Sequence, residues 1–586
     1  MSDRPLVSGR TFSRRRALGL TAGLGLAATV APSLSSSSLA FAAPAPSAYP
    51  KGARPQVLNV FTESTLSLPE RTLATTLQGL MARRRGDSLY LNLPGLGYQF
   101  WLDDLVARYG VRTRPGDLWK TVQRSGVRGY LLFREGTPSV NVATTLAGVT
   151  GAVAIEESLE ALAIRHGLRK VLDVRDKDDR WVFDTYWSRL RHDVAVEQRA
   201  DIPERLRDYV TMAGTLAFFD GNSEFRAEVV AALDDDATVI GWGDASSGED
   251  AFIGVNSLAG VKALPADHAR NLSILSGIHE DRLTQGGRLF DPTLGGSGGG
   301  SGSGSGATDL RHTVQGAAVA AAATRSSTAT PTTGVLSGGG GGRALVPQPD
   351  PDAHYVSFLI TDGDNIQWAL GDFPTDQRWF GSPRRGEVDL GWGISPSLID
   401  LAPSVMRWFY DHSATDRWVA GPSGGGYMYP SRYPAAALEK HTASLARAMG
   451  RSDLSVAQII DFDAFENTRL WSSYLKRPEI DGLIYLEYSR YDGLKGQVVW
   501  SEGKPVISAR TMLWDGLDGA DEASVTAELN AATRNPHSTA GYSVVVWHAW
   551  SKSVDDVLTV VDGLAPHVKV VPPDTLVRMV SKYAKP

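Results

Sequence analysis

Two aspartates separated by one glycine follow a predicted strand and are the strongest candidates for chemistry in this sequence. Asp362 and Asp364 come directly after the apolar run 355–360. Carboxyl groups at a strand end can act as a general acid beside an ionised partner, or accept hydrogen bonds from sugar hydroxyls. They can also bind a hard cation, but the rest of a calcium-loop pattern is missing. An Asx-turn with a helix cap is the alternative without chemistry.

Further acids stand at the ends of two later predicted strands. Glu487 ends the apolar run 482–487, where a charge is costly unless it is paired or functional, so we expect a function. Asp463 follows the run 457–460, and helix capping there is an equal alternative. Glycoside hydrolysis needs one protonated carboxyl group for the leaving oxygen and one ionised carboxylate as nucleophile or base. The predicted catalytic set is Asp362, Asp364, Glu487 and Asp463.

Aromatic and polar side chains near these acids are candidates for holding a sugar. Tyr and Trp offer a flat apolar face with a polar edge, which suits a sugar ring. A core tryptophan at Trp392 and a structural histidine at His548 are equally good interpretations of those two residues. The predicted substrate-binding residues are Tyr427, Tyr429, Trp392, Trp368, Gln367, His548 and Trp547.

The heptapeptide 424–430, Gly-Gly-Gly-Tyr-Met-Tyr-Pro, places two of these tyrosines in one shaped loop. Glycine allows positive φ and the close approach of a ligand, and Pro430 disfavours helical backbone at Tyr429. A tight turn with half-buried tyrosines is the simpler alternative. The position of the loop beside acidic strand ends favours a loop that faces the substrate. It holds no acid or base, so it can position a sugar but cannot cleave one.

An alternation of strands and helices must position these residues. After residue 354, eight predicted strands in about 230 residues suit a (β/α)8-like barrel, which places its active site at the carboxyl ends of the strands. The predicted fold class is therefore α/β, with this barrel preceded by an N-terminal α/β region. The predicted strands are 355–360, 388–392, 418–420, 457–460, 482–487, 505–509, 542–547 and 568–570.

The remainder of the chain divides by composition. Residues 54–285 alternate apolar strands with amphipathic helices, which predicts an α/β region of one or two lobes that shapes or covers the cleft. Residues 286–347 are rich in Gly, Ser and Ala, so we expect a disordered linker or insertion there. The catalytic domain then spans 348–586.

The first residues carry an export pattern. Arg14 and Arg15 precede a weakly apolar stretch, and small residues around Ala42 suit cleavage. We expect residues 1–42 to be a signal peptide of the twin-arginine pathway and the protein to be secreted. A retained membrane anchor is the weaker interpretation, because Ser-rich sequence follows the apolar stretch.

Composition and missing motifs exclude several classes of protein. The 586 residues carry a formal net charge of −6, and loss of residues 1–42, with five Arg and one Asp, leaves −10. Without a basic stripe, we expect no nucleic-acid partner. The chain has no Cys, which excludes disulfides and thiolate chemistry. It also lacks a Gly-x-Ser-x-Gly elbow, HExxH, and phosphate or dinucleotide fingerprints, so we predict no cofactor and no metal site.

Motifs along most of the chain resemble the GxGYxYP family, which is named after the pattern that 424–430 matches. The resemblance covers most of 54–280, including the run 139–146, and of 350–580, including the run 362–368. It implies sugar hydrolysis, with a glycan or small carbohydrate as substrate, but supplies no catalytic pair. The long insertion departs from the short connection usual in that family.

Two alternatives from other classes stay open. The first is a secreted glycan-binding protein, in which the aromatic clusters matter and the carboxylates do not. The second is a metal-dependent hydrolase or deacetylase on the same barrel, with Asp362, Asp364 and His548 as ligands.

Overall fold

The computed structural model describes residues 49–584, except 96, 203, 220–222, 244–247, 286–345 and 414. The predicted signal peptide and nearly all of the predicted linker lie outside the described residues. The described chain belongs to one compact unit, Ser47–Pro586. None of its described helices combines the length and apolar character needed to cross a membrane.

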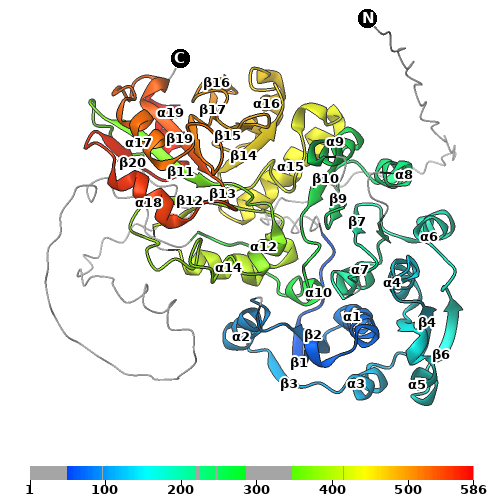
Figure 1. Cartoon of the computed structure of the whole chain (residues 1–586). Helices are drawn as coiled ribbons and strands as arrows, with labels where there is room; N and C mark the ends of the chain where they lie inside the picture. The colour runs from blue at the N-terminus through cyan, green and yellow to red at the C-terminus, as the bar shows by residue number, and fades with distance from the viewer. Residues whose placement is uncertain are drawn as a thin grey trace, which may run out of the picture. The chain divides into compact units, whose positions relative to one another are not determined.

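The C-terminal part is built on one curled sheet of ten strands (Figure 1). The strand order is β16-β17-β15-β14-β13-β12-β11-β19-β18, and β20 also pairs with β11. All pairs are parallel except β16 with β17. The strands are β11 His354–Ile360, β12 Leu390–Ile394, β13 Arg417–Ala420, β14 Val456–Asp461, β15 Gly482–Glu487, β16 Val498–Ser501, β17 Lys504–Ser508, β18 Thr511–Leu513, β19 Tyr542–Trp547 and β20 Val568–Val570.

This sheet is a curled half-barrel, and a closed (β/α)8 barrel is not confirmed. Each of the eight predicted strands overlaps an observed one. However, β19 pairs directly with β11, from Tyr355 with Tyr542 to Ile360 with Trp547. That pairing occupies the place between the seventh and first strands, where the eighth strand of a closed barrel would lie. The strand β20 pairs instead with the start of β11, at residues 354–356.

The last helix covers the amino ends of the strands and leaves their carboxyl ends open. Helix α19 contacts β11, β13, β14, β15, β17 and β19. A Cβ on Gly391 would lie 2.8 Å from Pro573, and one on Gly482 would lie 2.5 Å from Val577, so both strand starts need glycine. The helices of this part are α12 Ile366–Leu370, α13 Leu398–Leu401, α14 Pro403–Asp411, α15 Ala435–Arg451, α16 Thr468–Leu475, α17 Glu522–Asn530, α18 Val554–Asp562 and α19 Pro573–Tyr583.

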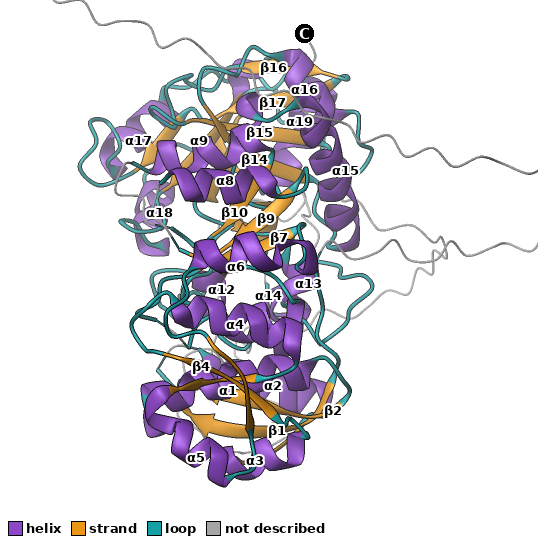
Figure 2. Ribbon diagram, turned by 90° about the vertical axis from the view of Figure 1, so that its right-hand side faces the viewer, coloured by secondary structure: helices purple, strands orange, loops and turns teal. Residues whose placement is uncertain are grey.

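The N-terminal region contains three small parallel sheets, with helices on their faces (Figure 2). Their strand orders are β2-β1-β3, β5-β4-β6 and β10-β9-β7-β8. The sequence did not predict β3, β6, β7 or β10; of these, β6 is an exposed edge strand that carries charges in place of an apolar run. The strands are β1 Pro55–Thr62, β2 Gly86–Asn92, β3 Arg112–Pro115, β4 Gly129–Phe133, β5 Val153–Glu156, β6 Arg169–Asp173, β7 Val194–Glu197, β8 Ala217–Phe218, β9 Ala237–Ile240 and β10 Val261–Leu264.

The heptapeptide loop joins the third of these sheets to the C-terminal part. Tyr427 donates its N–H to the carbonyl of Ala263 at 2.7 Å, and Ala263 donates to the carbonyl of Tyr427 at 3.0 Å. Tyr429 donates its N–H to Ser257 Oγ at 2.9 Å. The N-terminal helices are α1 Leu68–Ala82, α2 Tyr98–Tyr109, α3 Leu118–Ser125, α4 Ser139–Thr150, α5 Glu160–Arg165, α6 Asp179–Tyr186, α7 Arg207–Ala213, α8 Glu224–Ala232, α9 Glu249–Ala259 and α10 Leu272–Leu275.

Candidate active site

A cavity of about 580 Å³ opens at the carboxyl ends of the C-terminal strands. Its floor comes from the loops after β11 and β19 and from the ends of β14 and β15. The N-terminal region closes one side with residues from the segments around β9, α9 and β10, namely Trp242, Glu249, Pro265 and Asp267. The expectation that this region shapes the cleft therefore agrees with the cavity lining.

The loop after β11 presents Asp362 and Asp364 to the cavity because glycines allow tight backbone packing. A Cβ on Gly363 would lie 2.3 Å from the backbone of Gly393. A Cβ on Gly421 would lie 2.6 Å from the backbone N of Asp364. Asp362 has a φ of 60°, a left-handed conformation that Asp tolerates better than most residues. The loop therefore holds both carboxyl groups on a rigid backbone.

The surroundings of the two aspartates give them different protonation states. Asp364 is 4 % exposed, and its Oδ2 finds no hydrogen-bond partner among the described residues. Burial, followed by the neighbouring charge of Asp362, raises the pKa of Asp364 well above its ordinary value. Burial raises the pKa of Asp362 to about 6, although hydrogen bonds from Thr361 and Trp550 lower it. Asp362 is therefore mostly ionised at pH 7, whereas burial and the neighbouring charge of Asp362 favour the protonated form of Asp364.

A third carboxylate reaches the cavity from the N-terminal region. Oε1 of Glu249, the first residue of α9, accepts hydrogen bonds from the hydroxyls of Tyr427 at 2.9 Å and Tyr488 at 3.5 Å. The ring of Trp242 lies nearly parallel to that of Tyr427, with centroids 6.1 Å apart. The sequence analysis missed Glu249 and Trp242, because their place in the site depends on how the third sheet packs against the C-terminal part.

A glutamine inside β14 was also missed. Gln458 is fully buried and lines the cavity, yet neither atom of its amide group has a hydrogen-bond partner in the described chain. Buried amides are normally paired, so this group is available to a ligand. A polar residue in the otherwise apolar run of β14 was the signal that could have identified it.

Three predicted binding residues line the cavity with the two aspartates, namely Tyr427, Gln367 and His548. His548 stacks on Trp514, with ring centroids 3.5 Å apart, and its Nδ1 is hydrogen-bonded to Ser551 Oγ at 2.8 Å. Burial lowers the pKa of His548 to about 4, so the ring is neutral at pH 7. Within the described part of the chain, no group of three or more His, Asp or Glu is placed to hold a metal ion.

Glu487 and Asp463 lie apart from the other two predicted acids, which corrects the expectation of a single acidic set. Leu486 and Tyr488 line the cavity, so the alternation of side chains along the chain directs Glu487 to the opposite side. There its carboxylate accepts hydrogen bonds from the N–H of Asp463 at 3.0 Å and the hydroxyl of Tyr485 at 3.2 Å. The side chain of Asp463 is exposed outside the cavity.

Four of the predicted sugar-binding aromatics belong to the core instead of the cavity surface. Trp392 and Trp547 are fully buried, with ring centroids 5.6 Å apart. Tyr429 is fully buried as well. Trp368 is 6 % exposed and supports Trp550, which lines the cavity, at a centroid distance of 5.0 Å. These residues stabilise the walls but present no face to a ligand.

The heptapeptide loop has two sides with different roles. Gly424 and Gly426 have φ values of 112° and 157°, which only glycine adopts readily. A Cβ on Gly426 would lie 2.9 Å from the carbonyl oxygen of Ala263, so glycine also permits the junction with β10. Tyr427 faces the cavity and Tyr429 faces the core, so the loop joins the two regions and supplies one wall.

Comparisons with known proteins agree with this arrangement. Family models described as the first, second and third GxGYxYP N-terminal domains match residues 57–125, 127–190 and 192–277, each of which contains one of the three small sheets. The model described as the GxGYxYP putative glycoside hydrolase C-terminal domain matches residues 352–581. Among curated proteins, none matches this chain.

One solved structure is similar over nearly the whole chain. It is the crystal structure, at 1.25 Å resolution, of a putative hydrolase from Bacteroides thetaiotaomicron VPI-5482. The two proteins are 30 % identical, with a TM-score of 0.74, and the match covers 92 % of this chain and 96 % of that one. Together with the four family models, this similarity shows that the chain belongs to the GxGYxYP family.

Proposed function

We propose that this protein is a glycoside hydrolase in which Asp364 is the general acid and Asp362 is the nucleophile or general base. The observation that carries the proposal is the pair of unequal carboxyl groups in one cavity, since Asp364 is 4 % exposed with an unpaired Oδ2 and a strongly raised pKa, whereas Asp362 has a pKa of about 6. Glycosidic bond cleavage needs this division of roles. The description of the matched C-terminal family model and the hydrolase in the similar crystal structure support the same class of reaction.

The two aspartates can complete one reaction cycle without another acid. The Asp364 carboxyl group donates its proton to the glycosidic oxygen as the bond to the anomeric carbon breaks. The Asp362 carboxylate either attacks that carbon or takes a proton from the attacking water. Its negative charge also stabilises the positive charge that develops on the sugar ring. Hydrogen bonds from Thr361 and Trp550 keep Asp362 ionised and oriented.

The walls of the cavity suit a sugar ring. Trp242, Tyr427 and Tyr488 offer aromatic faces and hydroxyl groups, and Trp514 is held in place by its stack with His548. The unpaired amide of Gln458 can both donate to and accept from sugar hydroxyls. These groups account for binding, while the aspartates account for cleavage.

The roles of the two aspartates can be separated with leaving groups of different acidity. A dinitrophenyl leaving group departs without a proton, whereas an alkyl leaving group needs one. We expect Asp364→Asn to retain most activity on dinitrophenyl glycosides and to lose about 10³-fold on alkyl glycosides. We expect Asp362→Asn to lose about 10³-fold on both substrates.

The control variant is Asp463→Asn, which changes an exposed carboxylate outside the cavity and should retain wild-type activity on both substrates. Full activity of both cavity variants would rule out the assignment. Binding of a glycan without any product from the wild type, across a panel of glycosides, would favour the alternative of a glycan-binding protein.

We also propose export through the twin-arginine pathway, which is supported by the sequence of residues 1–42. Replacing Arg14 and Arg15 by Lys in the full chain should leave the protein in the cytoplasm, as measured by cell fractionation. Equal export of the variant and the wild type would contradict this proposal.

A further inference from the structure

We propose that the cavity selects sugars that carry a free amino group, and that Glu249 is the carboxylate that binds the ammonium ion. The proposal rests on the proposed function in taking the ligand to be a sugar. It adds the chemical class of that sugar and assigns a specificity role to a residue of the N-terminal region.

The first argument is the charge balance of the cavity. Four carboxyl groups line it, those of Asp362, Asp364, Glu249 and Asp267, and none of the described lining residues is Lys or Arg. The ring of His548 is neutral at pH 7 because burial lowers its pKa to about 4. Glu249 is exposed to solvent, but Asp364 is buried and Asp362 is half-buried, and negative charge there is costly without a cation nearby. A cationic ligand would therefore lower the free energy of the occupied cavity.

The second argument identifies the carboxylate that is available. The charge of Arg205, outside the cavity, and a hydrogen bond from Gln367 already stabilise the carboxylate of Asp267. Glu249 makes no ion pair within the described chain, and its Oε1 accepts only the two tyrosine hydroxyls. No described residue donates to its Oε2. Among the described residues, Glu249 is thus oriented by neutral donors, and its Oε2 has no partner.

The third argument is the set of aromatic rings around this carboxylate. Trp242, Tyr427 and Tyr488 line the same wall, and the first two rings are nearly parallel. The face of an aromatic ring attracts a cation, so the rings and the carboxylate favour the same ligand charge. The charge of Glu249 also contributes to the raised pKa of Asp362, which shows that both carboxylates act on the same space.

The fourth argument distinguishes an amino sugar from a simple amine. Gln458 is fully buried with both amide atoms unpaired, and Asp364 is 4 % exposed with Oδ2 unpaired. Such groups need partners that donate and accept hydrogen bonds, as sugar hydroxyls do. A ligand that has both hydroxyls and an ammonium group satisfies every unpaired group named here. A uronic acid or a sulfated sugar would add negative charge and is excluded by the same argument.

The test is calorimetric binding to the full chain at pH 6.5. The probes are glucosamine, glucose, N-acetylglucosamine and glucuronate, together with the corresponding galactose series. In at least one of the two series, we expect the amino sugar to bind at least about tenfold more tightly than the neutral sugar. The N-acetyl sugar should bind like the neutral sugar, and the uronate should not bind. In Glu249→Gln the preference should fall below twofold, while the affinity for the neutral sugar is kept.

The matched control is Asp250→Asn, which changes the next carboxylate of α9, exposed and outside the cavity lining, and should keep the full preference. Equal binding of amino and neutral sugars, no binding of any amino sugar, or an unchanged preference in Glu249→Gln would each overturn the inference. These monosaccharides contain no bond to cleave, so the result is independent of catalysis. A retained preference in a protein that hydrolyses nothing would overturn the proposed function alone.

Discussion

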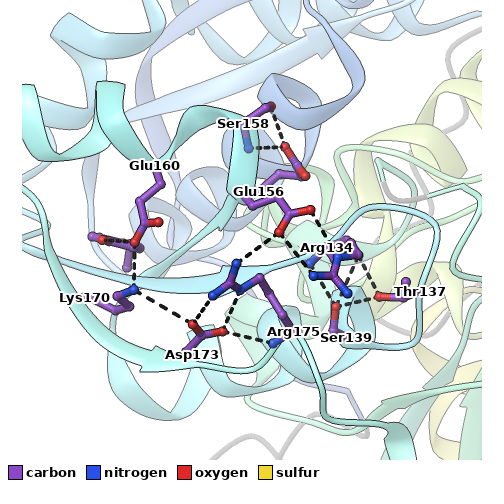
Figure 3. A network of polar contacts seen from close by, with 11 residues as sticks. Arg134, Thr137, Ser139, Glu156, Ser158, Glu160, Lys170, Asp173 and Arg175 are labelled. Atoms are coloured by element: carbon purple, nitrogen blue, oxygen red, sulfur yellow. Dashed lines mark hydrogen bonds and ion pairs between the residues drawn. The ribbon is translucent and has the colours of Figure 1, made fainter.

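Two clusters of acids stand at the carboxyl ends of parallel strands in this protein, and they differ in the cations around them. Beside the second N-terminal sheet, Asp173 at the end of β6 pairs with Arg175 at 2.7 Å, and Glu160 at the start of α5 pairs with Lys170 at 2.9 Å (Figure 3). In the cavity, no described Lys or Arg pairs with Asp362 or Asp364. A position at a strand end is therefore common to both clusters, and the missing cations and the burial of the acids distinguish the candidate active site.

The difference also appears in the protonation of the acids. Hydrogen bonds from Arg175 lower the pKa of Asp173, and those from Lys170 and Tyr130 lower the pKa of Glu160. Burial raises the pKa of Asp364 instead. The exposed cluster is thus permanently ionised near neutral pH, which suits a surface network. The buried cluster is poised to exchange a proton, which suits catalysis.

The largest expected difference between the clusters is in activity. Asp364→Asn should reduce kcat/KM on an alkyl glycoside about 10³-fold, because it removes the proton donor. Asp173→Asn should change kcat/KM less than twofold, because it alters only a surface ion pair. Steady-state kinetics on the same substrate measure both variants. Similar losses in the two variants would remove the distinction between the clusters.

The pH dependence of activity is the next largest effect. Asp362 must be ionised to act, so kcat/KM should fall tenfold per pH unit below its pKa of about 6. At pH 4 the loss should reach about 100-fold relative to pH 7. A pH profile of kcat/KM tests this expectation. An activity that stays constant down to pH 4 would exclude Asp362 as the base or nucleophile.

The two clusters should also change the pH dependence of the free energy of unfolding in opposite directions. The pKa of Asp362 is raised to about 6 from 3.8, so its protonation favours the folded state at low pH, and this contribution is lost as pH rises through 6. The loss amounts to about 3 kcal/mol. Relative to the wild type, Asp362→Asn should therefore gain stability between pH 4 and pH 8.

Asp173 gives the opposite slope, because its pKa is lowered and its stabilising contribution disappears as the pH falls. Urea unfolding of the wild type, Asp362→Asn and Asp173→Asn from about pH 2 to pH 8 measures both signs, because Asp173 titrates below its ordinary pKa. The same sign in the two variants would contradict the contrast between the clusters.

The smallest expected effect concerns the surface network. Arg175→Ala should lower the free energy of unfolding only slightly, because exposed ion pairs contribute little. In 1 M salt this difference should vanish as the charges are screened. Thermal or urea unfolding at low and high salt provides the measurement. A large cost that does not depend on salt would mean that the network supports the fold by packing.

The sequence predicted the ends of strands better than the direction of side chains. The Asp-Gly-Asp segment and eight of the ten strands of the C-terminal part could be recognised from apolar runs and the polar residues after them, whereas β16 and β18 were missed. Glu487 and Trp392 show the limit, because a buried strand is apolar on both faces and its pattern does not indicate which face borders a cavity.

Glu249 shows a second limit. It begins a helix of the N-terminal region and carries no local feature that separates it from Asp250 beside it. Its position at the cavity follows from the backbone bridge between Ala263 and Tyr427, which joins residues more than a hundred positions apart. Contacts of this kind depend on the packing of two regions, and no local pattern of residue types predicts them.

Helix α19 has a consequence for how the protein is made. Its eleven residues, Pro573–Tyr583, cover the amino ends of strands from both sides of the curled sheet. They follow every strand of this sheet in the sequence, so the C-terminal part cannot complete its core until the ribosome has released α19. A chain that stops before α19 exposes the starts of its strands. The C-terminal part thus contains its own check that synthesis has passed its last strand.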